Sequence, residues 1–280
     1  MTAEIIDGKL LAREIRDNLS LKIRELKRVP SLSVILVGDD EASKIYVHNK
    51  QKTALEIGTK CEVFELPEST TEKDLKALIE RLNNDNGVDG ILIQLPLPSH
   101  INSLEIISLI SPSKDVDGFS PYNTGMVQIG SQDAIVAATP KGILAILNSV
   151  MGDLSGKHAV IIGRSNIVGK PLVGLLLNQD CTLSVTHSKT KNIQEITKTA
   201  DILISACGVP GLIKKSWVKE GGVVIDVGIS RVDGKICGDT DFNEVSEVAS
   251  YITPVPGGVG PMTIAMLLDN LYNIAAKRNQ

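Results

Sequence analysis

The sequence alternates short apolar runs with longer amphipathic stretches along most of its length, and this alternation limits the folds open to it. Seven runs rich in valine, isoleucine and leucine lie at 33–38, 61–66, 89–95, 158–163, 183–187, 201–207 and 223–229. Parallel strands that are covered on both faces have this composition. Stretches with a helical pattern, such as 71–85 and 170–180, lie between them. We therefore predict an α/β fold with parallel sheets.

The 280 residues fit two domains, since one domain usually takes about 100–200 residues. Residues 111–139 are rich in Gly, Ser, Asp and Asn and are predicted to form a loop, after which Thr139 is the expected N-cap of a helix. A last helix is expected from near Pro261. We predict a first, α/β substrate domain of residues 1–139 and 260–280 and a Rossmann-type domain of residues 140–259. The last helix then returns to the first domain.

Composition and charge exclude several classes of protein. The net charge is −4 and no basic stripe is present, which argues against a nucleic-acid partner. The four cysteines lie far apart without a C-x-x-C pair, so neither a disulfide framework nor a metal site is expected. No apolar run approaches the ~20 residues of a membrane span, and the first residues lack the pattern of a signal peptide. We expect a cytoplasmic protein with no membrane partner.

The stretch HAVIIGRSNIVGKP, residues 158–171, is predicted to run from a buried strand through a tight turn into a helix. A P-loop is excluded because five residues separate Gly163 from Gly169 and Pro171 replaces the required hydroxyl. The G-x-G-x-x-G pattern is also incomplete, since Ser165 replaces its middle glycine. The strand–turn–helix context still suits a pyrophosphate at a helix N-terminus. An ordinary strand-to-helix turn remains an alternative.

The end of the following strand favours NADP over NAD. NAD-binding folds place an acid there for the ribose 2′-hydroxyl, but residues 186–190 read THSKT. A nearby arginine, lysine and hydroxyl suit a 2′-phosphate instead. Glycines at the ends of two later strands allow close approach to a flat ligand. The candidate NADP-binding residues are Gly163, Arg164, Ser165, Ser188 and Ile229, the last beside the nicotinamide.

The stretch YVHNK places Tyr46 and Lys50 four residues apart on one face of an expected helix. Short-chain dehydrogenases use a Tyr-x-x-x-Lys pair, but theirs follows the cofactor loop within a single domain. Here the pair precedes that loop by more than a hundred residues, so this superfamily is excluded. A surface pair without function is the alternative.

Two further polar features, a glutamine in a strand and a pair of acids in a loop, are notable in the first domain. Gln94 lies near the carboxyl end of an apolar strand, where a polar side chain needs a partner. Asp115 and Asp117 lie in the loop KDVDGF. A calcium loop is excluded because its twelfth position, counted from Asp115, is Met126. A turn-capping role and a ligand-binding carboxylate both remain open.

Seven motifs together resemble one enzyme family. They are YVHNK, GILIQLPLP, KDVDGF, GRSNIVGKPL, ADILISACGVPG, DVGIS and YITPVPGGVGPMTIAMLL, and they cover essentially the whole chain in order. The sequence is similar to bifunctional methylenetetrahydrofolate dehydrogenase/methenyltetrahydrofolate cyclohydrolases. The resemblance implies NADP-dependent oxidation of 5,10-methylenetetrahydrofolate, hydrolysis to 10-formyltetrahydrofolate, a role in one-carbon metabolism and purine biosynthesis, and a homodimer.

The resemblance also implies roles for particular residues. Lys50 corresponds to the family's motif lysine and would move protons during hydrolysis, with Gln94 holding its amine. Tyr46 would stack on the folate and orient Lys50, and Asp117 would bind the pterin edge. Ser43 would add a contact to the substrate. The loop of Pro256, Gly257 and Gly258 would line its aminobenzoate arm.

Three positions depart from the family's usual residues: Ala138 replaces a cysteine, His48 a common lysine and Thr240 a valine. A required thiol at position 138 is thereby excluded. Two other functions remain open at this stage. One is a different NADP-dependent dehydrogenase, and the other is a nucleotide-binding module without catalysis.

Overall fold

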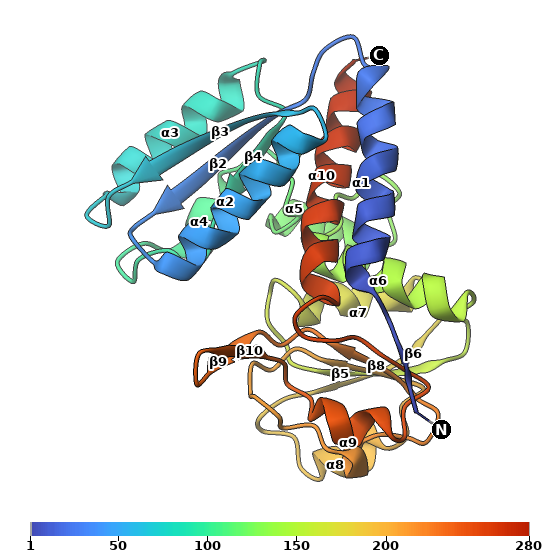
Figure 1. Ribbon diagram of the computed structural model, residues 1–280. Helices are drawn as coiled ribbons and strands as arrows, with labels where there is room; N and C mark the ends of the chain where they lie inside the picture. Colours follow the sequence, from blue (N-terminus) through green and yellow to red (C-terminus); the bar gives the residue numbers. More distant parts are fainter. Residues whose placement is uncertain (1, 280) are drawn as a thin grey trace. The chain divides into compact units, whose positions relative to one another are not determined.

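The computed structural model describes residues 2–279, which form two compact units (Figure 1). The three-stranded unit contains Glu14–Met126, Asp133–Ala138 and the chain from Ile264 onward. The six-stranded unit contains the N-terminal residues up to Arg13, Val127–Gln132 and Thr139–Thr263. Each unit is named after its largest sheet.

The three-stranded unit is built on a parallel sheet in the order β3-β2-β4. Its strands are β2 (Ser31–Val37), β3 (Lys60–Leu66) and β4 (Gly90–Ile93). Helices α3 (Glu72–Asn84) and α4 (Ser103–Ser108) cover one face, because Leu75 and Ile106 share a buried core with Ile35 of β2. Helix α2 (Glu41–Glu56) lies on the opposite face (Figure 1).

Two long helices run side by side, α1 (Gly8–Arg24) and α10 (Val259–Arg278), and most of each belongs to this unit (Figure 1). The Lys22 ammonium of α1 lies 5.8 Å from the ring centroid of Tyr272 of α10, a cation–π distance. A Cβ placed on Gly90 of β4 would lie 2.9 Å from Leu271 Cδ1. The absence of a side chain at Gly90 therefore lets α10 pack directly on the sheet.

The six-stranded unit has an all-parallel sheet in the order β1-β11-β8-β7-β5-β6. The strands are β1 (Glu4–Ile5), β5 (His158–Ile162), β6 (Thr182–Thr186), β7 (Ile202–Ser205), β8 (Val223–Asp226) and β11 (Tyr251–Ile252). Helices α8 (Ile193–Thr197) and α9 (Phe242–Ser246) and the short helix η1 (Lys215–Trp217) cover one face. Helices α6 (Ala138–Met151) and α7 (Gly169–Leu177) lie on the other (Figure 1). Strands β9 (Ser230–Val232) and β10 (Lys235–Cys237) form a separate antiparallel hairpin.

The predicted α/β class is confirmed, and each of the seven predicted strands is present with slightly different bounds. Two local predictions are wrong. The stretch 111–139 was predicted to be a loop but contains helix α5 (Pro121–Gln128). Its residues, PYNTGMVQ, lack the regular spacing of apolar side chains from which a helix is predicted. Thr139 is not an N-cap, because α6 begins at Ala138; the Thr139 hydroxyl instead lies 3.0 Å from that of Thr263.

The units also divide differently from the predicted domains. The N-terminal residues group with the six-stranded unit because β1 adds to its sheet edge, with Glu4 opposite Tyr251. Residues 127–132 join the same unit, where Asn178 Nδ2 donates a 2.8 Å hydrogen bond to the Val127 carbonyl. Pairing between residues so distant in sequence leaves no local signal in the sequence.

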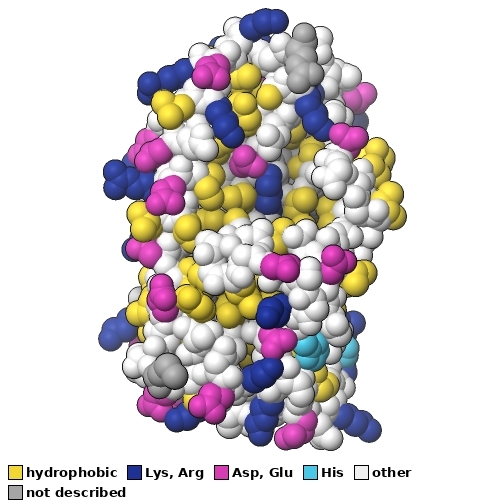
Figure 2. Space-filling model, turned by 90° about the vertical axis from the view of Figure 1, so that its right-hand side faces the viewer, with side chains coloured by type: hydrophobic (Ala, Val, Ile, Leu, Met, Phe, Trp, Pro, Cys, Tyr) yellow, Lys and Arg dark blue, Asp and Glu magenta, His cyan; other side chains and the backbone are white. Residues whose placement is uncertain are grey.

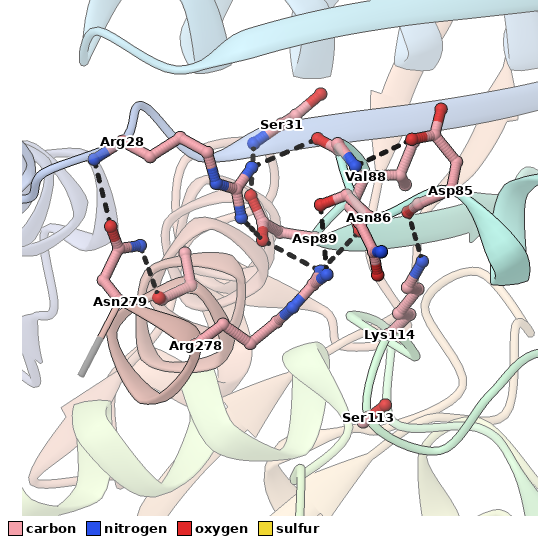
Figure 3. A network of polar contacts seen from close by, with 12 residues as sticks. Arg28, Ser31, Asp85, Asn86, Val88, Asp89, Ser113, Lys114, Arg278 and Asn279 are labelled. Atoms are coloured by element: carbon pink, nitrogen blue, oxygen red, sulfur yellow. Dashed lines mark hydrogen bonds and ion pairs between the residues drawn. The ribbon is translucent and has the colours of Figure 1, made fainter.

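A buried polar network fixes the amino-terminal side of the three-stranded sheet (Figure 3). The fully buried Asp89 carboxylate accepts hydrogen bonds from Arg28, from the Ser31 N–H at 3.0 Å and from Arg278 at 3.0 Å. A buried carboxylate without such donors would be strongly destabilising. The network therefore ties the end of α10 to the start of the sheet.

In the same region, Lys114 closes the carboxyl end of α3 (Figure 3). Its Nζ donates hydrogen bonds of 2.9, 2.8 and 2.7 Å to the carbonyls of Leu82, Asn83 and Asp85. The last carbonyls of a helix otherwise have no partner, and a cation there complements the helix dipole. Lys114 thereby anchors the segment that leads to Asp117.

On the face drawn in Figure 2, acidic and basic side chains are interspersed. Within residues 2–279, none of the helices combines the length and the apolar character that crossing a membrane demands.

Candidate active site

Each of the two parallel sheets has a topological switch point, and several candidate residues follow the carboxyl ends of the strands that meet there. In the three-stranded sheet, β3 and β4 pair on opposite sides of β2. Ligands of open parallel sheets bind outside the carboxyl ends of the strands at such a point. The carboxyl end of β2 leads into α2, and that of β4 leads into Gln94.

Helix α2 has a cap residue at its start and a glycine after its end. Asp40 is the N-cap, and its carboxylate accepts a 2.8 Å hydrogen bond from the Ser43 N–H. Gly58 follows the helix with φ +94°, a conformation that glycine adopts at little cost. Lys50 is 8% exposed and Tyr46 37% exposed. The pair is therefore not a surface pair, because the lysine is buried.

Lys50 contacts Gln94 directly. Its Nζ donates a 3.1 Å hydrogen bond to Gln94 Oε1. The Gln94 amide group is oriented by its own 2.7 Å bond from Nε2 to the Leu95 carbonyl, and its backbone N–H bonds to the Ile35 carbonyl at 2.9 Å. Gln94 thus extends the pairing of β4 with β2 and presents its side-chain oxygen to the lysine.

The two acids of the KDVDGF loop have different environments. Asp115 shapes the loop, since its oxygens accept hydrogen bonds from the N–H groups of Gly118, Phe119 and Ser120 and from Asn123 Nδ2. The Asp117 carboxylate accepts no hydrogen bond from the described part of the chain, although the residue is only 9% exposed. The turn-capping role therefore belongs to Asp115, and Asp117 remains available to a ligand.

Burial shifts the pKa values of Lys50 and Asp117 toward each other. Desolvation lowers the pKa of Lys50, and the negative charge of Asp117 opposes this shift. Desolvation raises the pKa of Asp117 to about 6, against the opposing effect of Lys50 and with a contribution from Asp115. Burial also raises the pKa of Tyr46. A lysine and an aspartate with shifted pKa values in one site are typical of proton-transfer chemistry.

Ser43 and the Pro256 loop, the remaining predicted substrate contacts, lie in different units. Ser43 is buried near the start of α2 in the three-stranded unit. The loop of Pro256, Gly257 and Gly258 belongs to the six-stranded unit. A Cβ on Gly258 would lie 2.7 Å from the Pro254 carbonyl oxygen, so this loop tolerates no side chain there.

In the six-stranded sheet the switch point lies between β5 and β7, because β6 pairs on the other side of β5. Gly163 directly follows β5 and has φ +122°, and a Cβ there would lie 2.3 Å from the Ala206 carbonyl oxygen. A Cβ on Gly169 would lie 2.3 Å from the Gly163 carbonyl oxygen. The two glycines therefore allow the tight strand-to-helix turn that a dinucleotide requires.

The other predicted cofactor residues surround this turn. The Ser165 hydroxyl accepts hydrogen bonds from the N–H groups of Val168 at 3.2 Å and Gly169 at 3.4 Å, so it organises the turn itself. Gly163 N–H bonds to the Thr186 carbonyl at 2.9 Å. Arg164 and Ser188 thus follow the ends of two paired strands, and both are exposed.

Ile229 follows the end of β8 and is 50% exposed. An exposed apolar side chain at the carboxyl edge of the sheet suits the face of a flat ligand. Behind this edge lies a buried pair of acids, Asp226 and Asp239, which the sequence patterns did not indicate. A glycine lies close to each acid in the sequence, Gly228 after Asp226 and Gly238 before Asp239, and this is the only local sign that the two acids are closely packed.

Two family models match the chain. The catalytic domain of tetrahydrofolate dehydrogenase/cyclohydrolase matches residues 6–117, and the NAD(P)-binding domain of the same family matches residues 137–279. The chain therefore belongs to the tetrahydrofolate dehydrogenase/cyclohydrolase family and is a bifunctional enzyme with an NAD(P)-binding domain.

Relatives and solved structures agree with this assignment. The bifunctional protein FolD of Halalkalibacterium halodurans is 54% identical over 98% of this chain and 99% of its own. The crystal structure of the bifunctional FolD of Campylobacter jejuni has a TM-score of 0.97 and 49% identity, covering 99% of both chains. The Trypanosoma brucei enzyme, described as complexed with NADP cofactor and inhibitor, has a TM-score of 0.95 and 37% identity, covering 99% of both chains.

Proposed function

We propose that the enzyme oxidises 5,10-methylenetetrahydrofolate to 5,10-methenyltetrahydrofolate with NADP and then hydrolyses the product to 10-formyltetrahydrofolate. The observation that carries this proposal is the buried Lys50, hydrogen-bonded to Gln94 at 3.1 Å and electrostatically coupled to Asp117. NADP accepts the hydride when it is bound. The remaining chemistry is binding, alignment and proton transfer by residues of this chain.

Lys50 is the proposed proton-transfer group of the hydrolysis. Water adds to the methenyl carbon, one carbon–nitrogen bond of the ring breaks, and one proton is released overall. Burial lowers the pKa of Lys50, so a neutral amine is available to accept a proton from the attacking water. The hydrogen bond to Gln94 holds that amine in place.

Asp117 is the proposed anchor of the pterin ring. A pterin edge offers adjacent N–H donors, and one carboxylate can accept both of them. The Asp117 carboxylate has no competing donor among the described residues. Tyr46 would stack on the folate, and Ser43 would add a contact. Pro256, Gly257 and Gly258 would line the aminobenzoate arm.

The NADP site is proposed at the carboxyl edge of the six-stranded sheet. Gly163 and Ser165 form the turn that receives the pyrophosphate. Arg164 and Ser188 supply a cation and a hydroxyl for the 2′-phosphate, which favours NADP over NAD. Ile229 would pack against the nicotinamide. The three-stranded unit would then carry the residues proposed for pterin binding and catalysis.

The cellular setting and assembly are also proposals. A homodimer is supported by Val232 and Ile236 of the β9–β10 hairpin, which are 45% and 43% exposed. A second copy of the chain could cover these apolar side chains. A cytoplasmic location suits four cysteines that are all free thiols. There the product, a one-carbon donor, would serve purine biosynthesis.

Initial-rate measurements with methylenetetrahydrofolate test the proposal. Reduced cofactor is followed with NADP and then with NAD at equal concentration, while methenyl product is followed in the same sample. We expect faster turnover with NADP and loss of the methenyl signal as it is hydrolysed. Absence of turnover with either cofactor contradicts the proposal. Turnover of another alcohol or amine substrate without activity on folate would indicate a different NADP-dependent dehydrogenase.

A further inference from the structure

Two buried aspartates, Asp226 and Asp239, lie behind the carboxyl edge of the six-stranded sheet. Asp226 is the last residue of β8, and Asp239 follows the β9–β10 hairpin. Asp239 is 0% exposed and Asp226 is 1% exposed. Neither residue is used in the proposed chemistry, and buried carboxylates are costly unless their environment supplies donors.

Asp239 bridges to the segment that follows β7. Its Oδ2 accepts hydrogen bonds from the Ser205 hydroxyl at 3.0 Å, from the Cys207 N–H at 2.9 Å and from the Gly208 N–H at 3.3 Å. The Cys207 thiol also donates to this oxygen, at 3.3 Å. One carboxylate oxygen thus fixes the backbone where β7 ends, 31 to 34 residues earlier in the sequence.

Asp226 binds the segment around Asp239 in return. Its Oδ1 accepts the N–H groups of Gly228 at 3.0 Å and Asp239 at 2.9 Å. Its Oδ2 accepts the Thr240 N–H at 2.8 Å and the Thr240 hydroxyl at 2.7 Å. The end of β8 and the end of the hairpin are therefore joined through this second carboxylate.

Two glycines make room for the paired acids. A Cβ on Gly228 would lie 2.2 Å from Asp239 Oδ1, and a Cβ on Gly238 would lie 2.1 Å from Asp226 Oδ2. Asp239 Oδ1 is buried and has no hydrogen-bond partner within residues 2–279. Its close contact with Gly228 shows that the carboxylate is packed between the ends of β7 and β8.

We infer that Asp239 is a positioning residue for the nicotinamide end of NADP. It sets the backbone after β7 directly and the backbone after β8 through its contacts with Gly228 and Asp226. This inference rests on the proposed NADP site, because Ile229 immediately follows Gly228. A backbone edge held from behind by buried carboxylates keeps its shape without contacting the ligand.

The substitution Asp239→Asn tests the inference. An amide can accept at only one of the two positions, so its NH₂ group faces either the donors of Cys207 and Gly208 or the Cα of Gly228. We expect KM for NADP to rise about tenfold, as the loss of a buried hydrogen-bond acceptor commonly costs this much. Hydrolysis of methenyltetrahydrofolate, measured without NADP, should change by less than about twofold because it needs no hydride acceptor.

Asp201→Asn is the matched control. Asp201 precedes β7 at the opposite end of the same strand, where it accepts the His158 N–H at 2.9 Å and pairs with Lys219. Replacing Asp201 therefore perturbs the six-stranded unit at the amino-terminal end of β7, far from the carboxyl end where NADP is proposed to bind. We expect KM for NADP to stay within about twofold of the unmodified enzyme.

An unchanged KM for NADP in folded Asp239→Asn enzyme overturns the inference, as does an equal loss of both activities. If this variant does not fold, Ser205→Ala replaces it, because it removes one donor to Oδ2. A rise in KM for NADP of about twofold or more then supports the inference, and no rise overturns it. Unmodified enzyme without any NADP-dependent turnover would instead refute the proposed function, so the two failures are distinguishable.

Discussion

Lys50 Nζ lies 3.1 Å from Gln94 Oε1 although the two residues are 44 positions apart in the sequence. The switch point between β2 and β4 brings them together, because α2 follows β2 and Gln94 follows β4. The amine is thereby buried beside a neutral acceptor. A neutral partner leaves the pKa of Lys50 low, whereas a carboxylate in the same place would raise it.

Lys50→Met should abolish hydrolysis while retaining the fold. We expect the rate of methenyltetrahydrofolate hydrolysis to fall about 100-fold or more, since general acid–base groups commonly contribute 10²- to 10⁴-fold. Thermal stability should not decrease, because the methionine removes a buried amine whose charged form is disfavoured. Lys52→Met, an exposed position on the same helix, is the control and should retain both activities. Hydrolysis that survives in Lys50→Met would refute the assigned role.

Gln94→Glu should shift the pH dependence of hydrolysis. A carboxylate at this distance stabilises the protonated lysine, so we expect the rising limb of the pH–rate profile to move upward by about 1 to 3 pH units. Gln94→Leu supplies no such charge and should not move the limb upward. The profiles are measured with methenyltetrahydrofolate alone. Identical midpoints in Gln94→Glu and the unmodified enzyme would show that Lys50 does not control this limb.

The pKa of about 6 at Asp117 predicts weaker folate binding in mild acid. The pKa of this carboxyl is raised above its ordinary value of 3.8, so the protonated form is favoured in the folded protein. Its contribution to stability is fully present below about pH 4 and is lost as pH rises through about 6. The proposed binding of the pterin uses the ionised form of this carboxyl.

We therefore expect KM for methylenetetrahydrofolate to rise as pH falls below about 6, while the protein itself is not destabilised by this group. Asp117→Asn should raise KM at every pH and remove the dependence. Initial rates between pH 5 and pH 8, interpreted with a stability measurement at each pH, provide the test. A KM that is flat with pH in the unmodified enzyme would contradict the assignment.

The sequence predicted those parts of the structure that leave a local pattern. Runs of valine and isoleucine marked the buried strands, and a glutamine within an apolar run marked Gln94. The ends of α2 also have residues typical of helix caps, Asp40 and Gly58, because capping depends on short-range chemistry. These features supplied the fold class and the three-stranded half of the candidate site.

Features that depend on distant contacts were missed. Strand β1 is two residues long and exists through its pairing with β11. The hydrogen bond between Asp239 and Ser205 joins residues 34 positions apart, and the sequence around neither residue indicates that the two are in contact. Asp115 and Asp117 cannot be told apart in the sequence. The folded loop distinguishes them, because Asp115 accepts backbone hydrogen bonds within the loop and Asp117 does not.

Arg164→Ala should reduce the preference for NADP. Loss of the guanidinium removes the cation proposed for the 2′-phosphate, so we expect KM for NADP to rise by about tenfold or more. KM for NAD, which lacks this phosphate, should change little. Lys198→Ala, on the surface of the same unit, is the control and should change neither value. Equal increases in KM for both cofactors would place Arg164 outside the 2′-phosphate site.

Lys114→Met should destabilise the three-stranded unit and weaken folate binding together. The substitution leaves the carbonyls of Leu82, Asn83 and Asp85 without their charged donor. We expect a loss of about 2 to 4 kcal/mol in the free energy of unfolding, measured by urea denaturation. Because Lys114 anchors the segment that carries Asp117, KM for methylenetetrahydrofolate should also rise in the folded fraction.

Lys73→Met provides the comparison, since Lys73 is an exposed residue of α3, the helix whose last carbonyls bind Lys114. It should leave both stability and KM within error, because exposed substitutions seldom change stability by more than about 0.5 kcal/mol. If Lys114→Met lowers stability but leaves KM for folate unchanged, the anchor acts on α3 alone. The position of Asp117 would then be set by Asp115 and its backbone donors Gly118 and Ser120.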